Sequence, residues 1–261
     1  MACYIFGAGS FYGLDTIPGP EDRILAADGG WRWCRECGLM PELLLGDFDS
    51  LGQVPEFDHV LRVPVEKDDT DMMLAIKHGL AEGEREFHLY GGMGGRRTDH
   101  TVANFQALAY LARRGAQGWL YGQGEKFTAI ESSAVTFPAR EHGILSVFCW
   151  GADARGVSIR GGQYPLENAA LTAAFPLGVS NHFMGNPITV SVEQGCLLPF
   201  TGEGYYPASL SEPLSCVIGA MHANYHITPG SYKHDMEIKQ GGNMAILAGV
   251  GPMGLAAINY A

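Results

Sequence analysis

The feature that most constrains the fold is an apolar run that ends abruptly in acidic residues. Three leucines at positions 43–45 lead directly into Gly46, Asp47, Phe48, Asp49 and Ser50. Adjacent leucines are typical of a buried strand, and alternate side chains of an extended segment share a face, so Asp47 and Asp49 are expected to point the same way. Two such carboxylates repel each other unless a cation such as Mg²⁺ neutralises them. A solvated Asx turn is the alternative for this segment taken alone.

Two further acidic segments accompany this one. The run 24–27 ends at Asp28, which two glycines follow. Farther along the chain, Thr70 is expected to cap a helix over residues 71–81, with Asp71 in its first turn. An acid there has an ordinary explanation as well, because it compensates the helix dipole. Three acidic loops in one domain nevertheless favour a shared site at the carboxyl edge of a parallel sheet.

A fourth segment supplies positive charge. A strand is expected over residues 87–90, a glycine-rich loop occupies residues 91–95, and Arg96 and Arg97 follow it. Glycines allow close approach to a ligand, and arginine binds phosphate oxygens with two parallel hydrogen bonds. The segment therefore predicts a phosphate clamp, with a flexible turn and solvated arginines as the alternative.

The periodicity of apolar residues divides the chain into two structural parts and a tail. Up to about residue 124, short apolar runs alternate with helical patterns, which indicates βαβ units. Beyond that point, short strands separated by glycine, proline and asparagine indicate an all-β region. Helices are expected over residues 31–37, 71–81 and 101–114, the last ended by Gly115. Strands of the second part are expected over residues 134–137, 143–150, 156–159, 188–192 and 196–200.

The order of these motifs resembles the thiamine pyrophosphokinase family over about residues 1–200. The matching residues are Asp28-Gly29-Gly30, Gly46 to Ser50, Lys67 with Thr70 and Asp71, Gly94 to His100, and Ser180-Asn181. Each motif is weak alone, whereas five in the same order are specific. The family usually has one residue between its arginine and the Asp-His pair. Arg97 keeps that spacing and Arg96 adjoins the glycines, so the phosphate arginine is either of the two.

The resemblance implies a fold and a reaction. The fold would be a Rossmann-like α/β ATP-binding domain over residues 1–124, followed by a thiamine-binding β-sandwich over residues 125–203, in a homodimer that shares the thiamine site. The reaction would be ATP-dependent transfer of a diphosphoryl group to the hydroxyl of thiamine, which gives thiamine diphosphate and AMP. A metal ion and arginine would neutralise the charge that develops on the phosphates.

The resemblance also implies roles for individual residues. The ligands of Mg²⁺ would be Asp47, Asp49 and Asp71. The nucleotide contacts would be Asp28, Gly29, Gly30, Lys67, Thr70 and Arg96. The catalytic residues would be Asp71, Arg97 and Asp99, with either acid as the proton acceptor. The substrate contacts would be Asp99, His100, Ser180 and Asn181.

Composition excludes several classes of partner. The net charge of −11 argues against nucleic acid or an anionic membrane as the ligand. No apolar run approaches the roughly 18 residues of a membrane span, and the first residues lack the pattern of a signal peptide, so a cytoplasmic location is expected. Cys34 and Cys37 are spaced like a zinc or redox pair, but no second pair lies nearby and the context is not thioredoxin-like. Reduced thiols are therefore expected.

The tail, residues 204–261, has a different character. Its apolar run 244–248 leads into a GxGxxG loop that begins at Gly249, which is a dinucleotide-binding fingerprint. The tail resembles an internal segment of a medium-chain, zinc-type alcohol or sugar-phosphate dehydrogenase, and we expect a truncated or artificially joined piece that does not function alone. His222 and His226 have metal-ligand spacing, but a third ligand is not evident.

Three alternative functions stay open at this point. A metal-dependent pyrophosphokinase for another alcohol, such as a pterin, could use the same acidic loops. The tail alone suggests a nicotinamide-dependent dehydrogenase fragment. A non-catalytic nucleotide-binding module is disfavoured, because binding alone does not need so many carboxylates of the kind that hold metals.

Overall fold

A computed structural model describes residues 1–48, 57–64, 66, 68–95, 97–203, 225–227 and 234–236. These residues fall into two compact units, Met1–Gly202 and Glu203–Ala261. In the second unit, strands β16 (Tyr225–Ile227) and β17 (His234–Met236) pair antiparallel. Every described residue with a predicted functional role belongs to the first unit.

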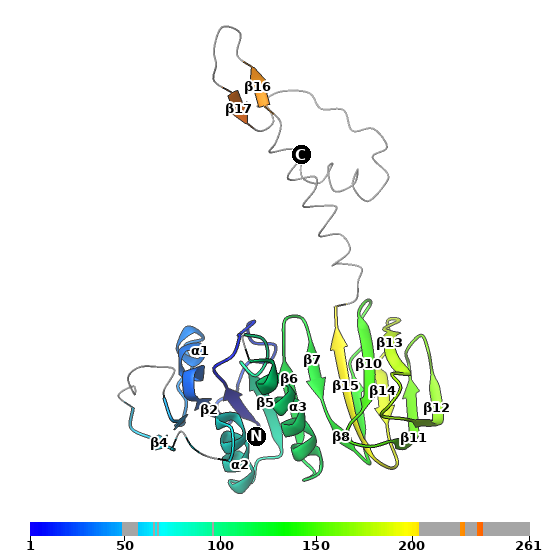
Figure 1. Cartoon of the computed structure of the whole chain (residues 1–261), viewed down its shortest axis with the longest axis horizontal. Coiled ribbons are helices and arrows are strands. Elements are labelled where there is room, and N and C mark those ends of the chain that lie inside the picture. The colour runs from blue at the N-terminus through cyan, green and yellow to red at the C-terminus, as the bar shows by residue number, and fades with distance from the viewer. Residues whose placement is uncertain are drawn as a thin grey trace. The chain divides into compact units, whose positions relative to one another are not determined.

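Parallel strands form one half of a large sheet in the first unit (Figure 1). They are β1 (Cys3–Phe6), β2 (Arg23–Ala27), β3 (Leu43–Gly46), β4 (Val60–Arg62), β5 (Glu86–Tyr90) and β6 (Gln117–Tyr121). Their order is β6-β5-β1-β2-β3-β4. The chain runs from β1 outward to β4 and then returns to β5 on the other side of β1. Such a reversal leaves a crevice beyond the carboxyl ends of the strands, where open α/β sheets bind ligands.

Helices cover both faces of this parallel region. They are α1 (Trp31–Glu36), α2 (Asp71–Ala81) and α3 (Thr98–Ala112). Because side chains alternate along a strand, β1 serves two cores. Cys3 and Ile5 pack with buried residues of α2 and α3, whereas Tyr4 and Phe6 pack with α1 on the other face. Within the described residues, no helix is both long and apolar enough to cross a membrane.

The large sheet continues into the C-terminal half with antiparallel strands. Beyond β6 the order is β7 (Lys126–Thr128), β15 (Cys196–Gly202), β10 (Ile144–Cys149) and the edge strand β13 (Gly178–His182), and β8 (Ile130–Glu131) also pairs with β15. A second, antiparallel sheet has the order β12 (Leu166–Leu171), β11 (Ala154–Arg160), β14 (Ile188–Ser191) and β9 (Ala134–Phe137). The two sheets share a core that contains Phe137, Leu145 and Val190. The fold is thus mixed α/β, with a large sheet and a second antiparallel sheet.

Most predicted elements are present, with shifts at their ends. Helix α2 has the predicted bounds, and α1 ends one residue early. Helix α3 begins three residues before the predicted start and ends at Ala112, two residues early, while Gly115 follows with a positive φ of 67°. Strands β4, β6, β7, β8, β12 and β13 were not among those predicted. The sequences of β12 and β13, LENAAL and GVSNH, lack the run of β-branched and aromatic residues that marks a strand.

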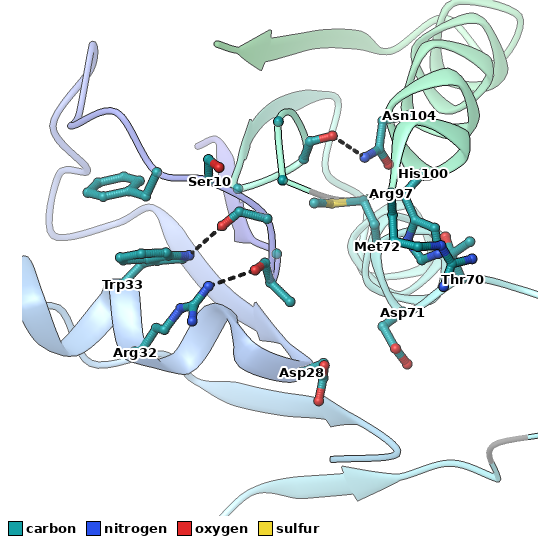
Figure 2. A pocket seen from close by; sticks show the side chains of 18 of the residues that line it. Ser10, Asp28, Arg32, Trp33, Thr70, Asp71, Met72, Arg97, His100 and Asn104 are labelled. Atoms are coloured by element: carbon teal, nitrogen blue, oxygen red, sulfur yellow. Dashed lines mark hydrogen bonds between the residues drawn. The ribbon is translucent and has the colours of Figure 1, made fainter. Parts of the chain in front are cut away.

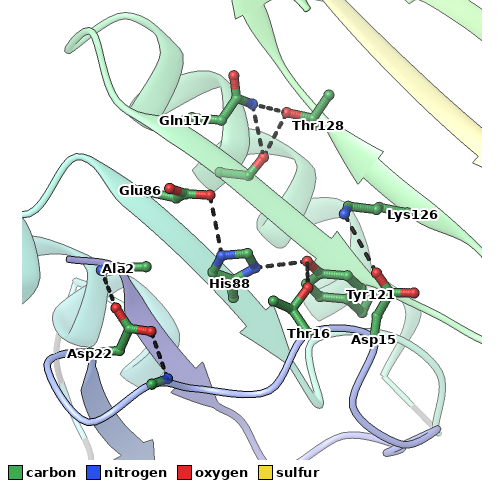
Figure 3. Close-up of polar contacts among 12 residues, drawn as sticks. Ala2, Asp15, Thr16, Asp22, Glu86, His88, Gln117, Tyr121, Lys126 and Thr128 are labelled. Carbon is green, nitrogen blue, oxygen red and sulfur yellow. Dashed lines mark hydrogen bonds and ion pairs between the residues drawn. The ribbon is translucent and has the colours of Figure 1, made fainter. Parts of the chain in front are cut away.

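A buried polar network holds the β1–β2 connection on the face of the sheet that bears α1 (Figure 3). The ring nitrogen Nδ1 of His88 lies 2.7 Å from the Tyr121 hydroxyl, and its Nε2 lies 3.4 Å from Glu86 Oε1. The backbone N–H of Thr16 donates to the Tyr90 hydroxyl at 3.1 Å. Tyr90 stacks on Tyr121 with ring centroids 4.4 Å apart. The connection is thereby fixed above the strands that lead to the crevice.

Candidate functional site

A cavity of about 820 Å³ lies where the chain reverses direction beside β1 (Figure 2). The loops that follow β1, β2, β3 and β5 line it, together with the first turns of α2 and α3. The acidic lining residues are Asp28, Asp47, Asp69 and Asp71. The basic and ionisable ones are Arg32, Arg97 and His100. Carboxylates and cations from separate loops therefore share one space.

The Asp-Gly-Gly motif is shaped by backbone geometry. Asp28 has a φ of 48°, a left-handed conformation that a residue with a side chain adopts at a cost of about 1–3 kcal/mol. A Cβ atom on Gly30 would lie 1.8 Å from the carbonyl oxygen of Phe6, so only glycine fits there. Gly29 and Gly30 are buried and do not line the cavity, whereas Asp28 does. Only Asp28 of this motif is thus placed to contact a ligand with its side chain.

The acidic pair after β3 departs from the extended geometry expected for it. Asp47 lines the cavity. Phe48, however, is buried and has a φ of 61°, so the chain is not extended there and strand alternation does not govern the direction of the next side chain. Asp49 lies outside the described residues.

The start of α2 carries the predicted helix cap. The Thr70 hydroxyl accepts a hydrogen bond from the N–H of Met73 at 3.2 Å, which is N-cap geometry. Asp71 follows in the first turn, and both residues line the cavity. The neighbouring Asp69 carboxylate is held by Lys77, whose Nζ lies 2.6 Å from Asp69 Oδ2. Lys67 lies outside the described residues.

The glycine loop after β5 packs backbone to backbone with the loop after β1. The N–H of Gly9 donates to the carbonyl of Gly91 at 2.8 Å. A Cβ atom on Gly91 would lie 2.2 Å from the carbonyl oxygen of Gly7. Both loops line the cavity, although the sequence argument assigned no role to residues 7–10. The Gly-Ala-Gly that follows the first strand was the available signal.

The first turn of α3 holds an ion pair. Arg97 donates to both carboxylate oxygens of Asp99, with Nη2–Oδ2 at 2.7 Å and Nε–Oδ1 at 3.0 Å. These hydrogen bonds lower the pKa of Asp99 to about 2, so the carboxylate is a weak base at neutral pH. Arg97 and His100 line the cavity, while Asp99 is not among its lining residues. Arg96 lies outside the described residues.

Ser180 and Asn181 lie on the edge strand β13 and do not line the cavity. Ser180 has a φ of 60°, and its N–H donates to the Ser146 hydroxyl at 3.0 Å. Asn181 is buried, and its amide exchanges two hydrogen bonds with the backbone of Tyr164, at 2.7 and 2.9 Å. The Asn181 side chain therefore fixes the turn between β11 and β12.

Among the other lining residues without a predicted role are Asn104, Arg32 and Trp33. Asn104 donates from Nδ2 to the carbonyl of Gly92 at 2.6 Å and so fixes the glycine loop. Arg32 and Trp33 come from α1, immediately after the Asp-Gly-Gly motif. Within the described residues, which exclude Asp49, no three His, Cys, Asp or Glu side chains are gathered closely enough to hold a metal ion.

Part of the chain is similar to sugar-phosphate oxidoreductases. Over 108 residues, 39% of this chain, it is 44% identical to mannitol-1-phosphate 5-dehydrogenase of Aliivibrio fischeri, and the match covers 26% of that enzyme. Over 68 residues, 26% of this chain, it is 57% identical to L-sorbose 1-phosphate reductase of Klebsiella pneumoniae, covering 17% of that enzyme. The chain thus spans about a quarter or less of the length of these relatives.

A longer similarity points to a different family. Thiamine pyrophosphokinase of Bacillus subtilis is 26% identical over 188 residues, which cover 67% of this chain and 84% of that protein. The crystal structure of the B. subtilis enzyme has a TM-score of 0.71 at 22% identity, covering 78% of this chain and all of that one. The crystal structure of the Geobacillus thermodenitrificans enzyme has a TM-score of 0.69 at 24% identity, covering 79% of this chain and 99% of that one. These structures show the shared fold.

Two family models match separate parts of the chain. The model of the thiamin pyrophosphokinase catalytic domain matches residues 19–120, which contain all of the acidic loops. The model of the thiamin pyrophosphokinase vitamin B1 binding domain matches residues 134–197, which contain Ser180 and Asn181. Together the two matches cover more than half of the sequence, and the chain belongs to the thiamine pyrophosphokinase family of enzymes.

Proposed function

We propose that this chain transfers a diphosphoryl group from ATP to the hydroxyl of thiamine, giving thiamine diphosphate and AMP. The observation that carries the proposal is the cavity at the reversal point, where carboxylates of three loops and cations of two helices line one space. Phosphoryl transfer depends mostly on positioning and charge neutralisation, and this lining offers both. The family assignment supplies thiamine and ATP as the substrates.

The carboxylates of the cavity suit Mg²⁺. Asp47 and Asp71 line the same space, and carboxylate oxygens are the donors that this hard cation prefers. Asp47, Asp71 and Asp49 would hold the ion, which when bound neutralises charge on the triphosphate. The Thr70 cap fixes the turn that bears Asp71, so this ligand is held in place before a substrate arrives.

The reaction then needs a proton acceptor and an anion clamp. The thiamine hydroxyl oxygen attacks the β-phosphorus, the bond to the oxygen bridging the α- and β-phosphates breaks, and AMP leaves with that electron pair. Asp71 would accept the hydroxyl proton, because it lines the cavity, whereas Asp99 is tied to Arg97 and has a low pKa. Arg97, His100 and the glycine loop would contact phosphate oxygens.

Assembly as a homodimer completes the proposed site. Ser180 and Asn181 do not line the cavity of their own chain. Five large apolar side chains are exposed on the segment around β13: Tyr164, Phe175, Leu177, Val179 and Met184. An exposed apolar group at a sheet edge is typical of a protein interface. A second copy would cover this surface and bring its β13 region to the thiamine end of the cavity.

The two parts of the chain would divide the work. A Rossmann-like region over residues 1–124 would bind ATP, and a β-sandwich over residues 125–203 would bind thiamine. A cytoplasmic location fits this role: Cys3, Cys34, Cys37, Cys149 and Cys196 are free thiols in the described structure, as expected of a reducing compartment.

Product analysis with ATP, Mg²⁺ and thiamine tests the proposal. AMP and thiamine diphosphate in equal amounts are the expected products. ADP would indicate an ordinary kinase. Turnover of a pterin alcohol that thiamine does not inhibit would favour the alternative pyrophosphokinase instead.

A further inference from the structure

Arg32 is a cation on the wall of the cavity that α1 forms, whereas Arg97 immediately precedes α3 (Figure 2). Its guanidinium carbon lies 4.2 Å from the centroid of the Trp33 ring, and its Nη2 donates to the carbonyl of Ala8 at 2.8 Å. Trp33 is itself fixed, because it stacks on Phe11 with centroids 5.5 Å apart and donates from Nε1 to the carbonyl of Gly9 at 3.1 Å. The guanidinium is thus held between a ring and a loop.

The hydrogen-bonding capacity of Arg32 is largely unused. A guanidinium has five N–H donors, and among the described residues that of Arg32 makes a hydrogen bond only to Ala8 and no ion pair with a carboxylate. Arg97, by contrast, donates three times to Asp99. Arg32 therefore presents positive charge and spare donors to a cavity in which the carboxylates would be occupied by metal.

We propose that Arg32 binds a phosphate group of the nucleotide and that Trp33 is its positioning residue. The proposal rests on the proposed ATP chemistry of this cavity. The planar guanidinium matches two oxygens of one phosphate, and its contacts with Trp33 and the Ala8 carbonyl hold it in place in advance. Thiamine carries a positive thiazolium ring, which Arg32 would repel. The wall made by α1 therefore belongs to the nucleotide, and the triphosphate would extend from it toward Arg97.

Calorimetric titration of the full chain with ATP (with Mg²⁺), AMP and adenosine tests the role of Arg32. Arg32→Gln should weaken binding of ATP by about 10- to 100-fold, the range of a lost hydrogen bond to a charged group. The affinity for AMP should fall as well if the contacted phosphate is the one that AMP retains. Adenosine affinity should not change, because adenosine has no phosphate. Arg32→Lys should restore part of the loss, since it keeps the charge without the planar fork. Arg35→Gln is the matched control, because Arg35 is exposed on the same helix and does not line the cavity.

A double-mutant cycle tests the positioning role of Trp33. Trp33→Leu should raise the KM for ATP several-fold and leave the KM for thiamine unchanged. The double variant Arg32→Gln, Trp33→Leu should lose no more ATP affinity than Arg32→Gln alone, because the two residues act through one contact. Trp31→Leu is the control, since Trp31 contacts Phe57 outside the cavity lining. Additive losses would show that Trp33 only supports the fold.

The outcomes separate this inference from the proposed function. If the unaltered chain binds no ATP and forms no AMP with thiamine, the proposed function fails. If it does both and Arg32→Gln behaves like Arg35→Gln, only the role of Arg32 fails. A loss of adenosine affinity equal to that of ATP would also overturn the phosphate role, because Arg32 would then contact the nucleoside.

Discussion

Single residues of the predicted motifs adopt backbone conformations that most side chains avoid. Asp28, Phe48 and Ser180 all have positive φ angles, and each belongs to a motif that the sequence singled out. Each such residue costs about 1–3 kcal/mol and persists only where its surroundings enforce it. The sequence therefore reveals which residues form a motif. It does not reveal the backbone dihedral angles that decide where their side chains point. The extended geometry assumed at Phe48 failed for this reason.

Gly30→Ala should destabilise the fold by at least about 3 kcal/mol, because a Cβ atom would lie 1.8 Å from the Phe6 carbonyl oxygen, which is backbone and cannot rotate away. Gly19→Ala is the control, since its Cβ atom would meet nothing nearer than Asp22 Oδ2 at 3.6 Å. Urea denaturation followed by circular dichroism measures both. Equal midpoints for the two variants would contradict the close packing.

Asp47→Asn and Asp71→Asn should each lower turnover at least about 100-fold and leave the fold intact, because each keeps the shape of the side chain and removes a ligand charge. Asp49→Asn is expected to behave alike. Asp58→Asn is the control, since Asp58 is exposed and does not line the cavity. Near-normal turnover of all three variants at an ordinary Mg²⁺ concentration would contradict the assignment of these residues as metal ligands.

At the scale of elements, local signals determined what could be predicted. Helix α2 was predicted to the residue because Thr70 caps it and apolar residues repeat along it. The alternation of strands and helices likewise predicted the parallel region. The sheet order could not be predicted, since pairing β7 with β15 and β10 with β13 depends on contacts between distant segments. Arg32 was missed because an arginine in a short helix has no sequence signal until the fold places it at the cavity.

His88, in the buried network below the β1–β2 connection, should make the stability of the fold depend on pH. Burial lowers the pKa of His88, so the folded state keeps this ring neutral while the unfolded chain takes up a proton near the ordinary pKa of 6.5. Stability should therefore fall as the pH decreases below about 6.5, until the lowered pKa of the folded state is reached. His88→Gln should reduce stability at pH 7.5 and flatten this dependence, whereas the exposed control His59→Gln should not. Denaturation midpoints from pH 5 to 8 test this, and an unchanged slope in His88→Gln would refute it.

For the whole molecule, the exposed apolar group around β13 should hold two copies together. Phe175→Asp and Leu177→Asp place a charge where the side chains are 64% and 58% exposed, so each should favour monomers and reduce thiamine turnover without unfolding the chain. Ile17→Asp is the control, because Ile17 is 79% exposed but lies in the β1–β2 connection. Sedimentation velocity and turnover are measured together. A fully active monomer would refute the shared site.

The tail should be dispensable for the chemistry of the first unit. Met1–Gly202 forms a compact unit of its own, and among the described residues it contains the three apolar cores and the lining of the cavity. A chain that ends at Glu203 should therefore keep its thiamine turnover. We expect the 261-residue chain to bind no NAD(H), because a GxGxxG loop supplies only one side of the crevice that holds a dinucleotide. Calorimetry with NADH and turnover of both chains provide the test. Micromolar NADH binding that is lost on trimming would show a working dinucleotide site, and a collapse of thiamine turnover would show that the catalytic unit depends on the tail.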